Sequence, residues 1–226
     1  MPELAYCSTE QDGLDAYDLR RIARLEARYE SPVKRRVRVT NASIYREVTH
    51  LWSIPETRQY WTLCCRQSAS PNSEINQNVR IGLHGHRQYH GVDRDRILIE
   101  LNRRDHPDAH FYADEWLRAI ETCESFRPGL VYLDTTSMLN HRGALRLVAN
   151  TMPLCPPGTV LLANLMINNP HSSERSCDLG SIVTLVSKAL PASEVDMWAP
   201  DVRSYSYDHG HTEMATFVFL KKGRYV

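Results

Sequence analysis

Hydrophobic positions change their spacing after the first quarter of the chain. Over 14–29, apolar residues mixed with Arg and Glu recur at helical intervals, which predicts an amphipathic helix that Pro32 ends. The segment 33–40 alternates basic and apolar residues and is predicted to be extended, and a second helix is predicted over 41–52. We therefore predict that residues 1–56 form an N-terminal helical and basic extension.

Beyond this extension, short apolar runs alternate with helical segments. Five runs predict strands that are each followed by a helix: 60–65, 88–93, 110–113, 130–133 and 159–164. The helices are predicted to start near 70–75 and to cover 94–104, 114–125, 140–152 and 172–189. Two further strands, near 195–198 and 215–220, have no helix between them, so we predict a hairpin there.

Such alternation is typical of a parallel sheet covered by helices on both faces. The predicted fold class is therefore α/β: a three-layer sheet over residues 57–226, mostly parallel, with one antiparallel strand near the C-terminus. In a sheet of this kind, ligands bind at the carboxyl ends of the strands. Residues that end strands are therefore the candidates for chemistry.

Two of the predicted strands end abruptly in an acidic residue. The run 88–93 ends in Asp93, and the run that begins at Gly129 ends in Asp134. A carboxylate at such a position can accept both hydroxyls of a ribose, while one on a neighbouring strand faces the reacting end of the ligand. The pattern favours a nucleoside-containing cofactor.

Composition is that of an ordinary globular protein without a charge bias. The chain has 226 residues, with 27 Lys plus Arg against 27 Asp plus Glu, and a mean hydropathy of −0.44. No apolar run approaches the roughly 18 residues that span a membrane. The first residues lack the basic flank and apolar core of a signal peptide. We expect a cytoplasmic protein without membrane contact.

Cysteine, histidine and glycine motifs exclude several classes of site. The six cysteines form no C-x-x-C pair, so free thiols in a reducing compartment are expected. Histidines cluster only in or beside predicted turns, and no metal site is predicted. The motifs G-x-G-x-x-G, G-x-x-x-x-G-K-[ST] and G-x-S-x-G are absent, which argues against a dehydrogenase, a P-loop NTPase and an α/β-hydrolase.

Five strand–helix units, a sixth helix-linked strand and a closing antiparallel strand resemble the class I S-adenosylmethionine-dependent methyltransferases. The resemblance covers about residues 57–224 and implies their three-layer Rossmann-like sheet, with S-adenosylmethionine as cofactor. It places the methionine part of the cofactor over the loop after the first strand, and its nucleoside and methyl groups at the next three strand ends. The residues so implied are Cys64, Cys65, Arg66 and Gln67 in that loop, Asp93 with Arg94 for the ribose, Asp114 with Glu115 for the adenine, and Asp134 with Thr135 at the methyl group.

The first loop departs from the family pattern. Over 64–74 it contains no glycine, whereas the family uses glycine there so that the backbone can approach the cofactor. Either small residues suffice in a reshaped loop, or cofactor binding has been lost. The acids also have simpler alternatives, since Asp93 and Asp114 could each cap the following helix. Asp134 precedes Thr-Thr-Ser rather than an apolar helix start, and is predicted to orient the substrate, take a proton or contact the cofactor.

The extension carries the strongest local charge. Between Arg20 and Arg46 nine Lys and Arg face only Glu26 and Glu30, a net of 9 − 2 = +7. Such a stripe is expected of a contact with the phosphates of RNA or DNA. The residues predicted to make this contact are Lys34, Arg35, Arg36 and Arg38. The alternatives are a solvated helix face with internally paired arginines, or an acidic protein partner.

Two functions follow from these patterns. The first is an S-adenosylmethionine-dependent methyltransferase, with nucleic acid as a candidate substrate and Asp134 as its catalytic residue. The alternative is a non-catalytic Rossmann-like binding or scaffold protein that has lost the cofactor site, as the glycine-less loop suggests.

Overall fold

The computed structural model describes residues 14–30, 32–52, 59–138, 143–168, 188, 195–198, 205–206 and 213–222. Two helices lead into the sheet: α1 (Ala16–Tyr29) and α2 (Pro32–Trp52). The strands are β1 (Gln59–Leu63), β2 (Tyr89–Asp93), β3 (His110–Ala113), β4 (Pro128–Met138), β5 (Val160–Asn168), β6 (Val195–Trp198), β7 (Tyr205–Ser206) and β8 (Glu213–Lys221). The later helices are α3 (Glu74–Arg80), α4 (Arg96–Asp105), α5 (Trp116–Thr122) and α6 (Ala144–Thr151), with short 3-10 turns η1 (His86–Gln88) and η2 (Met152–Leu154).

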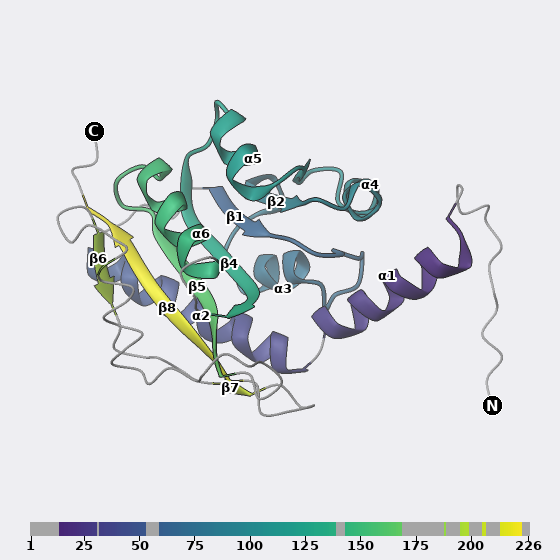
Figure 1. Cartoon of the computed structure of the whole chain (residues 1–226), viewed down its shortest axis with the longest axis horizontal. Coiled ribbons are helices and arrows are strands. Elements are labelled where there is room, and N and C mark those ends of the chain that lie inside the picture. Colours follow the sequence, from purple (N-terminus) through teal and green to yellow (C-terminus); the bar gives the residue numbers. More distant parts are fainter. Residues whose placement is uncertain are drawn as a thin grey trace.

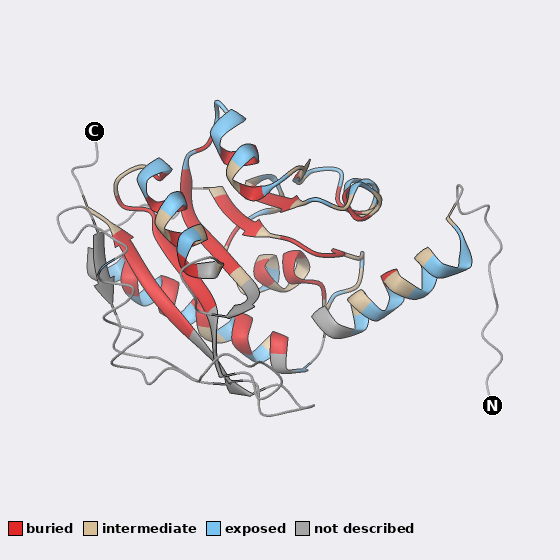
Figure 2. Ribbon diagram, in the orientation of Figure 1, coloured by how far each residue is buried: buried red, intermediate tan, exposed pale blue. Residues whose placement is uncertain are grey.

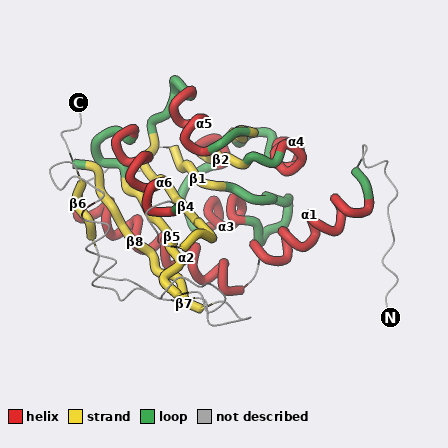
Figure 3. The backbone as a smooth tube through the Cα atoms, viewed as in Figure 1, coloured by secondary structure: helices red, strands yellow, loops and turns green. Residues whose placement is uncertain are grey.

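The strands form one eight-stranded sheet in the order β3-β2-β1-β4-β5-β8-β6, with β7 paired to β8 (Figures 1 and 3). Strands β1 to β5 are parallel, and β8 runs antiparallel to both β5 and β6. The predicted mixed sheet with one antiparallel strand near the C-terminus is therefore confirmed. The predicted helix 172–189 lies outside the described residues except for Lys188.

Alternating side chains of the strands build a core on each face of the sheet (Figure 2). In β4, Leu130 and Tyr132 pack towards α2, α3 and α4, whereas Val131 and Leu133 pack towards α5 and α6. The result is the three-layer arrangement expected of a sheet with helices on both faces. No helix among the described residues has both the length and the apolarity to cross a bilayer.

The prediction that 33–40 is extended is wrong, because this segment is the first half of α2. Proline is tolerated in the first turn of a helix, so Pro32 begins α2 instead of only ending α1. Lys34, Val37, Arg38 and Asn41 are all buried and share one helical face at positions i, i+3, i+4 and i+7. Two members of that face are charged, and the apolar pattern alone therefore missed it.

Two strands are longer than predicted. Strand β4 continues to Met138 and β5 to Asn168, although their apolar runs end near 133 and 164. The register shifts after Asp134, and pairing resumes between Met138 and Met166. Asp134 therefore lies inside a strand, opposite Asn164, and not at its end. The predicted boundary between 56 and 57 stays a prediction, while Ile44 and Val48 of α2 pack in the core of the sheet.

Candidate cofactor site at the carboxyl edge of the sheet

The loop after β1 is closely packed against β2. The amide of Cys64 donates to the carbonyl of Val92 at 3.0 Å, which extends the parallel pairing by one residue. A Cβ atom added at Gly91 would lie 2.8 Å from Cys64 Sγ, closer than such atoms approach. The glycine that this contact requires is thus in β2 and not in the loop.

A buried amide of α4 holds the loop in shape. Asn102 is fully buried, and its Oδ1 accepts from the Gln67 amide at 2.7 Å while its Nδ2 donates to the Cys65 carbonyl at 2.9 Å. Gln67 Oε1 in turn accepts from the Ile75 amide in the first turn of α3 at 3.2 Å. Sequence reasoning missed Asn102, whose only signal is a polar residue beside the apolar face of the helix predicted over 94–104.

Arg66 is a buried cation between two carboxylates. Its guanidinium pairs with Asp105 of α4 and lies 3.2 Å from Glu26 of α1. Arg66 is only 7% exposed, and Cys64, Cys65 and Gln67 are buried as well. The four loop residues predicted to contact the cofactor are therefore brought together as a tightly held turn.

Helix α1 is fixed to the same edge. Glu30 accepts hydrogen bonds from the hydroxyls of Ser68 and Ser70 at 2.7 and 2.9 Å. Arg21 pairs with Asp95 at the start of α4, and Ile22 packs with Cys65 and Leu98 in a small apolar cluster. The helix thus connects the loop after β1 to the turn after β2.

Asp93 ends β2 as predicted, and its carboxylate is half-buried. Its Oδ1 accepts from the Asp95 amide at 2.8 Å, and burial raises the pKa of Asp93. The N-cap of α4 is Asp95, which accepts from the amides of Ile97 and Leu98. The alternative that Asp93 serves as this helix cap is therefore wrong.

The turn after β3 lies beside Asp93. The Asp114 amide donates to the Asp93 carbonyl at 3.1 Å. The carboxylate of Asp114 is 3.3 Å from Arg118, and exposed Glu115 is 3.2 Å from exposed Arg94. The N-cap of α5 is Glu115, which makes no side-chain cap bond, so Asp114 is not that cap either. The structure thus brings these predicted residues to one edge.

Asp134 is held in a buried network on the α2 side of the sheet. Its Oδ2 pairs with Lys34 of α2, and the two side chains are 8% and 5% exposed. Its Oδ1 lies 3.4 Å from Nδ2 of Asn164, which also donates to the Tyr132 hydroxyl at 2.6 Å. Thr216 of β8 donates to Asn164 Oδ1 at 2.6 Å. The backbone of Thr135 follows in β4, and its side chain lies outside the described residues.

The four predicted phosphate-binding residues do not share one exposed surface. Lys34 is buried against Asp134, and Arg38 is buried with its guanidinium 3.2 Å from Gln77 Oε1. Arg35 is half-buried and Arg36 is exposed. A contact with phosphates requires exposed side chains, and Lys34 and Arg38 do not meet this condition, because the inward face of α2 carries them towards buried acceptors.

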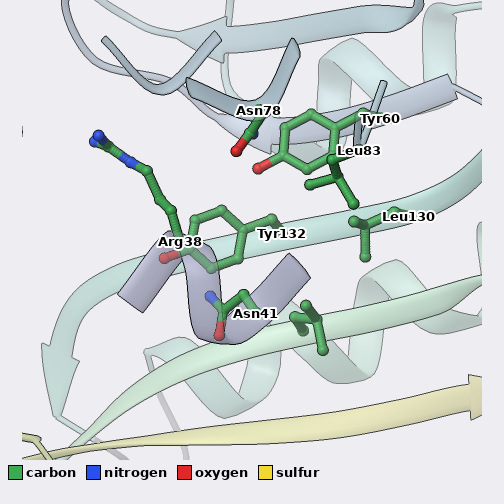
Figure 4. Close-up of a pocket in the computed structure, with 8 residues that line it drawn as sticks. Arg38, Asn41, Tyr60, Asn78, Leu83, Leu130 and Tyr132 are labelled. Atoms are coloured by element: carbon green, nitrogen blue, oxygen red, sulfur yellow. The ribbon is translucent and has the colours of Figure 1, made fainter. Parts of the chain in front are cut away.

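A small cavity lies between α2, α3 and the sheet (Figure 4). Its volume is about 10 Å³, and it is lined by Arg38, Asn41, Tyr60, Asn78, Leu83, Leu130, Tyr132 and Leu162. Oδ1 and Nδ2 of Asn41 and Nδ2 of Asn78 are buried without a hydrogen-bond partner in the protein. The space matches a single water molecule and cannot hold a nucleoside.

Beside the cavity, Glu74 of α3 is a buried carboxylate that accepts from the Tyr60 hydroxyl at 2.7 Å. Burial raises the pKa of Glu74, and the nearby charge of Arg38 opposes that rise. The α2 side of the sheet therefore holds two cations, Lys34 and Arg38, near two carboxylates. Among the described residues, no three His, Cys, Asp or Glu side chains are grouped to hold a metal ion.

No family model and no curated protein sequence matches the chain. Solved structures do. The plantazolicin methyltransferase BpumL, in complex with S-adenosylhomocysteine, has a TM-score of 0.58 at 10% identity, over 92% of this chain and 91% of that one. The O-methyltransferase from Bacillus cereus, also with S-adenosylhomocysteine, has 0.54 at 12% identity, over 93% and 94%. A methyltransferase from Clostridium acetobutylicum has 0.53 at 10% identity, over 91% and 99%.

At these identities the likeness shows the fold. The chain has the Rossmann-like fold of the class I S-adenosylmethionine-dependent methyltransferases, with its N-terminal helices and its antiparallel strand between β5 and β6. The resemblance predicted from the sequence is confirmed at this level. The roles of the individual site residues stay predictions.

Proposed function

We propose that this protein is an S-adenosylmethionine-dependent methyltransferase that binds its cofactor at the carboxyl ends of β1, β2 and β3. The position and burial of the Asp93 carboxylate are the observation that carries the proposal. Asp93 is the last residue of β2, beside the loop after β1, and its carboxylate is half-buried. Asp95, and not Asp93, is the N-cap of α4. A carboxylate accepts up to four hydrogen bonds, enough for both hydroxyls of a ribose. Asp114, joined to Asp93 through the backbone, would face the adenine.

The loop after β1 fits the role of a floor under the methionine part of the cofactor. Asn102 holds the loop backbone at Cys65 and Gln67, so the turn keeps one shape without the freedom of glycine. Cys64 packs directly on Gly91, which brings the ends of β1 and β2 together. When bound, the cofactor supplies the methyl group as a sulfonium.

For Asp134 we propose a positioning role. Of the three roles predicted, taking a proton suits it least, because Lys34 and Asn164 already occupy its two oxygens. Methyl transfer from a sulfonium depends mainly on in-line placement of the acceptor. Because Lys34 and Asn164 hold Asp134 on both sides, this part of β4 keeps one geometry, and we propose that it faces the methyl acceptor.

A specific observation favours the second candidate, a non-catalytic binding protein. The loop has no glycine, and the residues Cys64, Cys65, Arg66 and Gln67 are all buried. If this turn cannot open to the cofactor, the sheet edge serves another ligand or none.

Isothermal titration of the protein with S-adenosylmethionine and with S-adenosylhomocysteine separates the two candidates. The methyltransferase proposal expects one binding site for each compound, at the affinity ordinary for cofactors. A protein that is folded by circular dichroism and binds neither compound would leave only the non-catalytic candidate.

A further inference from the structure

The exposed arginines of α2 and α3 lack acidic partners. Arg36, Arg46 and Arg80 are exposed and Arg35 is half-buried, and none of the four forms an ion pair within the described part of the chain. These four residues are called the seam arginines here. The only carboxylates on α2 and α3 are Glu47 and Glu74, and Glu74 is buried. This surface therefore carries an excess of positive charge.

Among the exposed arginines that the structure describes elsewhere, five of ten are paired with a carboxylate. Arg87, Arg94, Arg103, Arg104 and Arg118 each lie within 4.0 Å of a carboxylate, the longest such contact being 3.9 Å. The zero net charge of the whole chain thus conceals an uneven distribution. On α2 and α3, by contrast, no exposed arginine forms an ion pair within the described part of the chain.

Three of the seam arginines, Arg35, Arg46 and Arg80, border the contact between the two helices, and exposed Arg36 is the neighbour of Arg35 on α2. Arg35 Nη1 lies 3.5 Å from Asn72 Oδ1, and Arg80 donates to the carbonyl of Pro71 just before α3. At the other end, Arg46 Nη2 lies 3.8 Å from the position that a Cβ on Gly82 would take. Along α2 the row from Arg35 to Arg46 extends about 16 Å at the helical rise.

The row begins at the proposed reacting edge. Lys34, the residue before Arg35, pairs with Asp134, and Asn72 belongs to the segment between β1 and α3. A polymer bound along the seam would therefore pass Asp134 of β4. Lys34 and Arg38, which the sequence pattern assigns to phosphate binding, lie beneath this surface.

We propose that the seam arginines bind the phosphate backbone of a single-stranded nucleic acid and lead one of its nucleotides to the edge at Asp134. Guanidinium groups present a planar fork that matches phosphate oxygens, and a row of them suits a regularly spaced polyanion. A single strand is required, because the atoms of a base within a duplex are out of reach of an enzyme edge. The binding stands without the cofactor; the delivery of an acceptor rests on the proposed function.

The test replaces the seam arginines together, as R35Q/R36Q/R46Q/R80Q. The matched control R87Q/R103Q/R104Q/R127Q removes the same charge from exposed arginines outside the seam. Fluorescence anisotropy measures binding of labelled oligouridylate and oligothymidylate over a range of salt. The parent and the control should share a steep salt dependence. The seam variant should lose up to about 2.8 units of that log–log slope, at about 0.7 per phosphate contact on a single strand.

Equal weakening in both variants would overturn the proposal, because it would show dependence on total charge alone. So would a parent protein that binds neither oligonucleotide at low salt, or one that binds polyglutamate as tightly. Thermal melts by circular dichroism show that all three proteins are folded. Titration of the same proteins with S-adenosylhomocysteine keeps the two proposals apart. A seam variant that no longer binds RNA but still binds S-adenosylhomocysteine supports the seam. A parent protein that binds RNA but not S-adenosylhomocysteine contradicts only the methyltransferase proposal.

Discussion

The two faces of the central sheet are filled differently beneath their helices. Under α5 and α6 the filling is apolar and aromatic, with Trp61, Leu133 and Phe219 among its buried members. Under α2 and α3 an apolar patch around Ile44 and Val48 gives way to buried charges and amides near the carboxyl edge. One face therefore resembles an ordinary core, and the other combines a core with a polar network.

The difference separates stability from position. Apolar packing rewards any arrangement that removes surface from water. A buried ion pair such as Lys34 with Asp134 costs desolvation of both ions, which is recovered only when the two meet in good geometry. A shift of α2 by one turn would leave both charges unpaired. The polar network thus specifies where α2 lies relative to β4, which apolar contacts alone do not.

The largest effect is expected at this ion pair. Lys34→Met should destabilise the protein by about 3–5 kcal/mol, because it leaves the carboxylate of Asp134 buried without its cation. The double variant Lys34→Met/Asp134→Asn, which removes both charges, should recover most of that loss. Urea unfolding followed by circular dichroism measures both. If Lys34→Met lowers the free energy of unfolding by less than about 1 kcal/mol, the value of a surface ion pair, the two faces do not differ in the way described.

Acid should destabilise the protein through one buried histidine on each face of the sheet. On the α3 side, the ring centroids of His84 and Tyr60 are 4.6 Å apart, and on the α5 side those of His90 and Trp61 are 4.5 Å apart. Burial lowers the pKa of His84 to about 4 and that of His90 to about 3, and the neighbours His86 and His110 add to the effect.

Because both pKa values are depressed in the folded state, the stability from neutral His84 and His90 is present above pH 6.5 and lost as the pH falls towards 4. The loss should reach about 3 kcal/mol for each histidine. His84→Gln and His90→Gln should each reduce the slope of unfolding free energy against pH, by the equivalent of about one proton taken up on unfolding. Two variants with the slope of the parent would show that neither histidine controls acid unfolding.

A substitution at the sheet edge should affect ligand binding more than folding. Asp93→Ala should weaken binding of S-adenosylhomocysteine by about 1.5–3 kcal/mol, through the lost hydrogen bonds to a charged group. Isothermal titration measures the effect, and the exposed carboxylate variant Asp108→Ala serves as control. Equal affinity in the parent and in Asp93→Ala would remove Asp93 from the ribose site.

The smallest effect is expected inside the cavity. Asn41→Leu should change stability by less than about 1 kcal/mol, because the Asn41 amide already lacks a partner in the protein. Asn102→Leu should cost more, about 1–3 kcal/mol in total, since it would leave the Gln67 amide and the Cys65 carbonyl without their partner. Equal costs in urea unfolding would mean that the cavity amide is satisfied as well.

The order of elements could be predicted because apolar runs report directly on strands that are buried on both faces. Strand β8 was found from its apolar run and from the missing helix before it. The first half of α2 could not be found in this way, because its inward face contains Lys34 and Arg38. Their burial depends on Asp134, one hundred residues further along, and on Gln77.

The candidate site was predictable where a strand end determines it and not where distant side chains do. Asp93 and Asp114 follow short apolar runs, so their position at one edge could be derived from the sequence. Asn102 was missed because its partners are backbone groups of a loop on another strand. The end of β4 was misplaced, since apolar content stops at Leu133 while the pairing continues to Met138.

The place of β8 in the sheet has a consequence for the growing polypeptide. This strand is made after β6 but lies between β5 and β6, with hydrogen bonds to both. In the growing chain, β6 therefore has no partner beside it until residues 213–221 are available. Until then β5 also presents an open edge, and unpaired edges are where chains associate wrongly. A pause in translation between residues 199 and 212 should thus prolong the interval in which the edge of β5 is open.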